Sequence, residues 1–173
     1  MSTIEGKRLV TISVTKALDS SDGAYAAEDV LSESKTAGTY WTFSSPAKVS
    51  GGTGYIVKAQ AISETNNITP RLTLYLFNAA PTSATHDNVA NTAVLHADIS
   101  QYIGKIDFNA MEDLGPAGTD STAITTPSTY GNLPLAFNCA TSTNVLYGIL
   151  VTRNAFTNTA TNDMTIKLMC EQY

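Results

Sequence analysis

Charge is the scarcest feature of this sequence. Asp, Glu, Lys and Arg together supply 14% of its 173 residues, against about 25% in an average globular domain. The ten Lys and Arg residues are scattered, and fifteen Asp and Glu residues give a net charge of −5. Because phosphate backbones are bound by clustered cations, this balance excludes nucleic acid as an expected partner.

Long apolar runs and cysteines are also scarce. The longest apolar run, Val145 to Val151, has seven residues, whereas a membrane-spanning helix needs about 20. The stretch from Lys7 to Ile12 is charged and then alternating, which is not the apolar centre of a signal peptide. We therefore expect no membrane segment and synthesis in a cytoplasm. Two cysteines, Cys139 and Cys170, do not make a disulfide framework, and we expect two buried, reduced thiols.

Metal-binding residues occur only in sparse groups. His86-Asp87 and His96-Ala97-Asp98 are the only places where a histidine has a carboxylate neighbour. A structural zinc site needs about four nitrogen or sulfur ligands and a catalytic site about three. The interpretation we favour is ordinary loop or surface histidines, with no metal and no cofactor.

Catalytic patterns are equally sparse. Glu112 and Asp113 are adjacent acids, but paired-carboxylate catalysis needs two groups that flank a substrate roughly 5 to 10 Å apart. The glycines of Gly51–Gly54 lack the following Lys-Ser/Thr or helix of a phosphate-binding loop, so a turn between strands is expected there. A serine is never placed in the strand–turn–helix context of a nucleophile elbow. We expect no enzymatic activity.

Period-two alternation of apolar and polar residues is abundant, whereas helical periodicity is nearly absent. Such alternation is typical of strands that have one buried face. The sequence predicts strands at Leu9–Val14, Tyr40–Phe43, Ala47–Val49, Tyr55–Glu64, Arg71–Phe77, Ile103–Phe108, Leu133–Phe137, Val145–Arg153 and Met164–Glu171.

Three of these strands carry a clear prediction of their inward face. The inward sets are Val57, Ala59 and Ala61; Leu72, Leu74 and Leu76; and Met164, Ile166, Leu168 and Cys170. The outward sets are correspondingly more polar or aromatic, with Thr73, Tyr75 and Phe77 opposite the leucines.

One helix is expected, over Ala93–Tyr102, and two long loops, Ala79–Thr92 and Met111–Tyr130. Asn66–Pro70 is expected to be a hairpin-like connection. Many strands with long cross-connections favour an all-β domain, a β-sandwich of jelly-roll or Greek-key type. We expect one domain over residues 1–173, with residues 1–7 as a flexible segment.

Aromatic residues could supply a platform for stacking on sugars. The candidates are Tyr25, Tyr40, Trp41, Tyr55, Tyr75 and Tyr147. All are spread over strands, where aromatic side chains normally pack, so packing is the favoured interpretation.

A homo-oligomer is expected from the apolar strands. Val145–Val151 is apolar on both faces, whereas a two-layer sandwich buries only one face of each sheet. Tyr75 and Phe77 also face away from the leucine side of their strand. A loop such as Ala79–Thr92 folding back over this surface is the alternative.

The sequence also resembles a known group of proteins. The likeness lies in Asp29-Val30, Phe43, Ala47 to Ile56 (AKVSGGTGYI), Leu72 to Phe77 (LTLYLF), Leu133 to Phe137 (LPLAF) and Leu146 to Arg153 (LYGILVTR). These residues resemble small virion structural proteins of tailed bacteriophages, and the likeness extends from about Tyr25 to the C-terminus.

The matched residues form strands and turns, so the resemblance implies a fold and a setting rather than a site. It implies a protein of the virion, a capsid decoration (cement) protein that binds the outer surface of the major capsid protein lattice, often as a trimer. The alternative is a receptor- or glycan-binding module of a tail fibre or baseplate.

Overall fold

A computed structural model describes residues 6–18, 23–115, 118–158 and 161–173. Residues 1–5 of the expected flexible segment therefore lie outside the described residues. The strands are β1 (Arg8–Leu18), β2 (Ala24–Tyr25), β3 (Val30–Leu31), β4 (Trp41–Ser44), β5 (Thr53–Ser63), β6 (Leu72–Phe77), β7 (Tyr102–Phe108), β8 (Glu112–Asp113), β9 (Ser121–Thr125), β10 (Leu135–Asn138), β11 (Val145–Thr152), β12 (Phe156–Thr157) and β13 (Asn162–Gln172).

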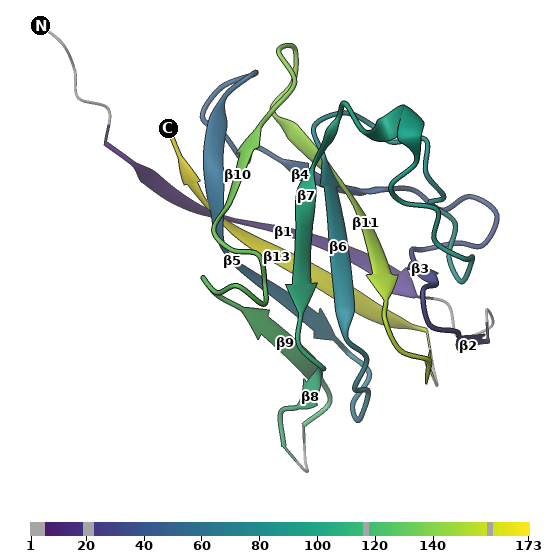
Figure 1. The fold of residues 1–173 in the computed structure, drawn as a ribbon. Coiled ribbons are helices and arrows are strands. Elements are labelled where there is room, and N and C mark those ends of the chain that lie inside the picture. The colour runs from purple at the N-terminus through teal and green to yellow at the C-terminus, as the bar shows by residue number, and fades with distance from the viewer. Residues whose placement is uncertain (1–5, 19–22, 116–117, 159–160) are drawn as a thin grey trace, which may run out of the picture.

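Two antiparallel sheets form the two layers of the domain (Figure 1). The six-stranded sheet has the order β1-β13-β5-β9-β8, with β10 also paired to β5. The five-stranded sheet has the order β3-β11-β6-β7, with β4 also paired to β11. The predicted all-β fold and β-sandwich are therefore confirmed, while the jelly-roll or Greek-key type stays a prediction.

The core between the two sheets follows the predicted alternation. Leu72, Leu74 and Leu76 of β6 are fully buried on one side, and Met164, Ile166, Leu168 and Cys170 of β13 are fully buried on the other. All belong to one apolar cluster. Burying a Leu, Ile or Met side chain contributes roughly 1.5–3 kcal/mol, so this alternation is a main source of stability.

A β-bulge changes the inward face of β5. Met169 lies opposite Lys58, but the next residue, Cys170, lies opposite Ile56. Val57 is therefore the extra residue on β5 and is only half-buried, while Ile56 is fully buried. The prediction of Ala59 and Ala61 as inward residues is confirmed, but the inward place predicted for Val57 belongs to Ile56. A bulge reverses the alternation locally, and sequence periodicity does not reveal it.

A second apolar cluster covers the outer face of the five-stranded sheet. It contains Val30, Phe77, Ile149 and Val151, with Tyr75, Ala93, Val94, Tyr102 and Tyr147 packed against them. Ala93 and Val94 belong to the long connection between β6 and β7. The chain thus covers most of the outward apolar surface of β11 by itself, and this surface no longer indicates an oligomer.

The prediction of a helix over Ala93–Tyr102 is wrong. Only a single 3₁₀ turn, His96–Asp98, forms there, and Tyr102 already begins β7. Ala93 and Val94 pack against the sheet instead. Tertiary packing therefore replaces the local helical preference of this segment.

The predicted strand Ala47–Val49 is also wrong, because the chain bends there on its way from one sheet to the other. The side chain of Asn144 takes the place of a strand partner. Its Oδ1 accepts from Ala47 N at 3.1 Å, and its Nδ2 donates to Ala47 O at 2.7 Å.

Two of the predicted connections differ from expectation. Asn66–Pro70 is no hairpin, because β5 and β6 belong to different sheets and the chain crosses between the layers. Met111–Tyr130 is no plain loop, because it contains β8 and β9. The inward residues of β9 are small or polar, among them Ser121 and Ala123, so this strand has little of the usual apolar signal.

Candidate functional site

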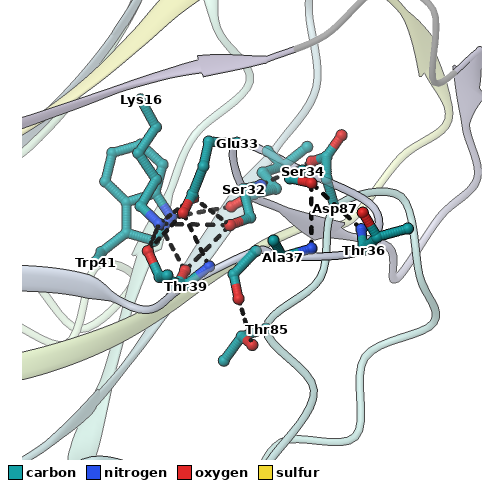
Figure 2. Close-up of polar contacts among 12 residues, drawn as sticks. Lys16, Ser32, Glu33, Ser34, Thr36, Ala37, Thr39, Trp41, Thr85 and Asp87 are labelled. Carbon is teal, nitrogen blue, oxygen red and sulfur yellow. Dashed lines mark hydrogen bonds and ion pairs between the residues drawn. The ribbon is translucent and has the colours of Figure 1, made fainter.

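A buried lysine is the most unusual polar feature of the described chain (Figure 2). Lys16 lies on the same face of β1 as Val10, Ile12 and Val14, so the alternation of the strand turns its side chain inward. Its Nζ donates to Thr39 O at 2.5 Å, Thr39 Oγ1 at 2.9 Å and Ser32 Oγ at 3.4 Å, and it forms an ion pair with Glu33. Burial lowers the pKa of Lys16, and Glu33 opposes that shift.

Glu33 is the partner of this lysine. Its Oε2 also accepts from Ser32 Oγ at 2.6 Å, and its Oε1 accepts from Thr39 Oγ1 at 2.6 Å and Thr39 N at 3.0 Å. Burial raises the pKa of the Glu33 carboxyl, but the hydrogen bonds from Lys16, Ser32 and Thr39 outweigh it and hold the pKa at about 2. The carboxylate is therefore charged at neutral pH.

Trp41 forms one wall of this cluster. The Lys16 ammonium lies 5.6 Å from the centre of its ring, within the range of a cation–π contact. The indole Nε1 donates to Leu31 O at 2.9 Å, and the side chain is 1% exposed. A sugar cannot stack on a ring that is buried in this way, so Trp41 does not belong to a glycan platform.

Asp87 extends the cluster to the loop that follows β6. Its carboxylate is fully buried and accepts from Tyr25 Oη and from Ser32 N, both at 2.7 Å. Thr85 Oγ1 donates to Gly38 O at 2.9 Å. The network therefore fastens the loop after β6 to the segment after β3.

The two histidines are both exposed, whereas their neighbouring aspartates are buried. Asp98 accepts from Thr82 N and Oγ1, both at 2.8 Å, and from Ser83 N and Oγ at 2.9 and 2.7 Å. Burial raises the pKa of Asp98, but these hydrogen bonds lower it overall. No group of three His, Cys, Asp or Glu residues in the described ranges could hold a metal ion.

The structure also shows where the remaining candidate residues from the sequence lie. Glu112 and Asp113 form the short edge strand β8, paired with β9. Ser50 and Gly51 form a turn before β5, and Gly51 has a φ of +69°, a left-handed conformation that suits glycine. The predicted turn is thus present at its first residue, while Thr53 and Gly54 already belong to β5.

Five of the six candidate aromatics are buried or half-buried. Tyr25 stacks on Phe156 at 4.7 Å, and Tyr40 packs edge-on against Tyr147 at 5.4 Å. Tyr55 is the exception at 41% exposure, and it packs edge-on against Tyr173 at 5.8 Å. Both line a shallow groove of about 620 Å³.

Two comparisons with known proteins gave no match. No protein-family model matches the chain, and no curated protein is significantly similar to it. Within the described residues, no helix is long and apolar enough to cross a membrane.

An open groove of about 760 Å³ lies between the edge strands β1 and β4. β1 pairs with β13 along its eleven residues, and no other strand in the described part of the chain pairs with it. The N-terminal half of β1, including Arg8, Val10 and Ile12, lines the groove together with Lys48. None of the lining residues is acidic. The sequence predicted β1, but only the sheet order shows that it is an edge.

Proposed function

We propose that the chain is a structural protein of a tailed-bacteriophage virion, a capsid decoration protein that binds the outer surface of the major capsid lattice. The proposal starts from the resemblance described above and includes no chemical step. The observation that carries it is the long edge strand β1 beside an open groove, a surface suited to assembly with another protein.

Strand addition explains why this edge suits an assembly role. A free edge presents a row of backbone N–H and C=O groups, which an extended segment of a partner can complete as an added strand. Backbone hydrogen bonds then supply affinity, and the groove supplies specificity. Arg8 and Lys48 favour a partner segment that carries carboxylates, because unlike charges attract.

Three copies around a capsid three-fold axis are part of the proposal. Engaging several capsid subunits at once raises the overall affinity without any new contact. Because the outer apolar face of the five-stranded sheet is largely covered within the chain, we place this trimer on the shell and not in free solution.

The copy number in purified particles tests this function. Hundreds of copies per particle are expected for a decoration protein, whereas a six-fold or twelve-fold ring would assign the chain to the tail or neck. Reconstitution on undecorated shells tests the groove. Arg8→Glu combined with Lys48→Glu should weaken binding to the shells, and Lys167→Glu on β13 is the matched single-site control. Equal binding by all three proteins would contradict the role of the groove.

A second candidate is a receptor- or glycan-binding module of a fibre or baseplate. The observation in its favour is the exposed ring of Tyr55, which lines the groove shared with Tyr173. Binding on a glycan array that is lost in Tyr55→Ala would support it. The absence of binding to any glycan on the array would contradict this second candidate function.

A further inference from the structure

A cationic pocket lies on the outer side of the five-stranded sheet, away from the groove at β1. It has a volume of about 340 Å³, and its charged lining residues are Arg71, Lys105, Arg153 and Asp107. Three cations and one carboxylate thus meet in one cavity of a protein whose net charge is −5. The three cations come from segments far apart in the sequence, and strand pairing brings them together.

The two arginines lie opposite each other in adjacent chain segments. Arg153 N donates to Arg71 O at 2.8 Å, which continues the ladder of β6 and β11 beyond the pair Leu72 and Thr152. Like charges directly opposite on neighbouring strands destabilise a sheet. A bound anion would offset this repulsion.

The carboxylates nearby neutralise only part of the positive charge. Asp107 forms an ion pair with Lys105 at 2.8 Å and accepts from Thr73 Oγ1 at 2.7 Å and Asn132 Nδ2 at 2.9 Å. Glu28 forms an ion pair with Arg153.

Among the described residues, Arg71 has no carboxylate partner. Its Nε donates to the neutral amide oxygen Asn154 Oδ1 at 3.1 Å, and its two terminal nitrogens form no hydrogen bond with the described residues. A guanidinium group binds a carboxylate through two parallel hydrogen bonds, so Arg71 presents the group that such a ligand needs.

The remaining wall of the pocket is polar and aromatic. Thr129, Tyr130 and Asn132 line it, and Tyr130 is 51% exposed. Their turn is fixed in place, because Asp107 N donates to Gly131 O at 3.4 Å and Gly131 N donates to Ser128 Oγ at 3.2 Å.

We propose that this pocket binds a sugar that carries a carboxylate. Arg71 binds the carboxylate, Tyr130 packs against the apolar face of the ring, and Thr129 and Asn132 hydrogen-bond its hydroxyl groups. The volume lies at the lower end of the roughly 300–1,000 Å³ typical of small-ligand sites, which suits one sugar unit. A bare phosphate would leave the aromatic wall without a contact.

The test uses the full chain with three probes: glucuronate, glucose and inorganic phosphate. Binding is measured by titration calorimetry and by NMR shift changes of the residues around the pocket. We expect glucuronate to bind in the millimolar range, more weakly at high salt, and glucose and phosphate to bind much less. Equal binding of glucose, equal binding of phosphate, or no binding of glucuronate would overturn the proposal.

Variants then locate the site. Arg71→Met should weaken glucuronate binding by about tenfold or more, while Lys167→Met on the other sheet should leave it unchanged. Tyr130→Ala changes an exposed turn residue and tests the site independently if Arg71→Met fails to fold. It should weaken glucuronate binding at least severalfold. Unchanged binding in a folded variant would overturn the proposal.

The inference does not rest on the capsid role, and Arg71→Met is expected to bind shells normally.

Discussion

Glu33 forms an ion pair with Lys16 across the two layers of the sandwich. Lys16 belongs to β1 at the edge of the six-stranded sheet, whereas Glu33 follows β3 of the five-stranded sheet. The Lys16 side chain is 8% exposed and the Glu33 side chain 31%. The contact therefore holds the far end of β1 against the opposite sheet.

Removal of the lysine tests this contact. Lys16→Met should lower the free energy of unfolding by roughly 1–3 kcal/mol, less than for a fully buried pair because Glu33 is partly exposed. The double variant with Glu33→Gln should lose less than the sum of the two single losses. Urea unfolding of the four proteins measures the coupling. Strict additivity would show that the two side chains do not act as a pair.

The pH dependence of stability follows from the pKa of Glu33, which is about 2 in the folded protein against 4.5 for an unperturbed glutamate. The depressed pKa means that the unfolded chain takes up the proton first. The contribution of Glu33 is fully present above about pH 4.5 and is lost as the pH falls toward 2. Unfolding midpoints of the unaltered protein and Glu33→Gln should thus converge at low pH. A constant difference between them would contradict this.

The apolar core is tested at Leu74, which is fully buried. Leu74→Ala should cost roughly 2–5 kcal/mol, because buried carbon atoms are lost and a cavity remains. Thr11→Ala, at an exposed position of β1, is the control and should be nearly neutral. An unchanged denaturation midpoint for Leu74→Ala would contradict the assignment of the inward face.

The opposite face of the same strand gives a separate prediction. Thr73 is 1% exposed, and its hydroxyl donates to Asp107 Oδ1 at 2.7 Å. Thr73→Val keeps the shape of the side chain but removes the donor, and it should cost about 1–3 kcal/mol because a charged acceptor loses a partner. Thermal unfolding measures this loss. An unchanged unfolding midpoint for Thr73→Val would show that this hydrogen bond adds no stability.

The two cysteines are free and buried. Burial raises the pKa of Cys170 to about 12, and it also raises the pKa of Cys139. Because the thiolate is the reactive form, a thiol reagent at pH 8 should react slowly with the native protein and rapidly after denaturation. Cys139→Ala should retain one slow thiol. Rapid native reaction would place a thiol at the surface.

The state of the free protein is a further expectation. Because the outward apolar surface of β11 is largely covered by the chain itself, light scattering should show a species near 18.3 kDa in solution. A stable species of three times that mass would show that the trimer forms before it reaches a shell.

The all-β class and the inward faces of β6 and β13 can be predicted from the sequence alone. Leu72, Leu74 and Leu76 recur at every second position, and a pleated strand must place such residues on one side. This information is local, so it can be read without knowing what each strand packs against.

The edge strands, the position of the β5 bulge and the segment that covers β11 depend on the tertiary structure. Lys16 lies beyond the predicted strand Leu9–Val14, and its partners Glu33, Ser32 and Thr39 come from other segments of the chain. Arg71 and Arg153 lie 82 positions apart and meet through strand pairing. Contacts of this kind depend on how distant segments approach, and local alternation carries no information about that approach.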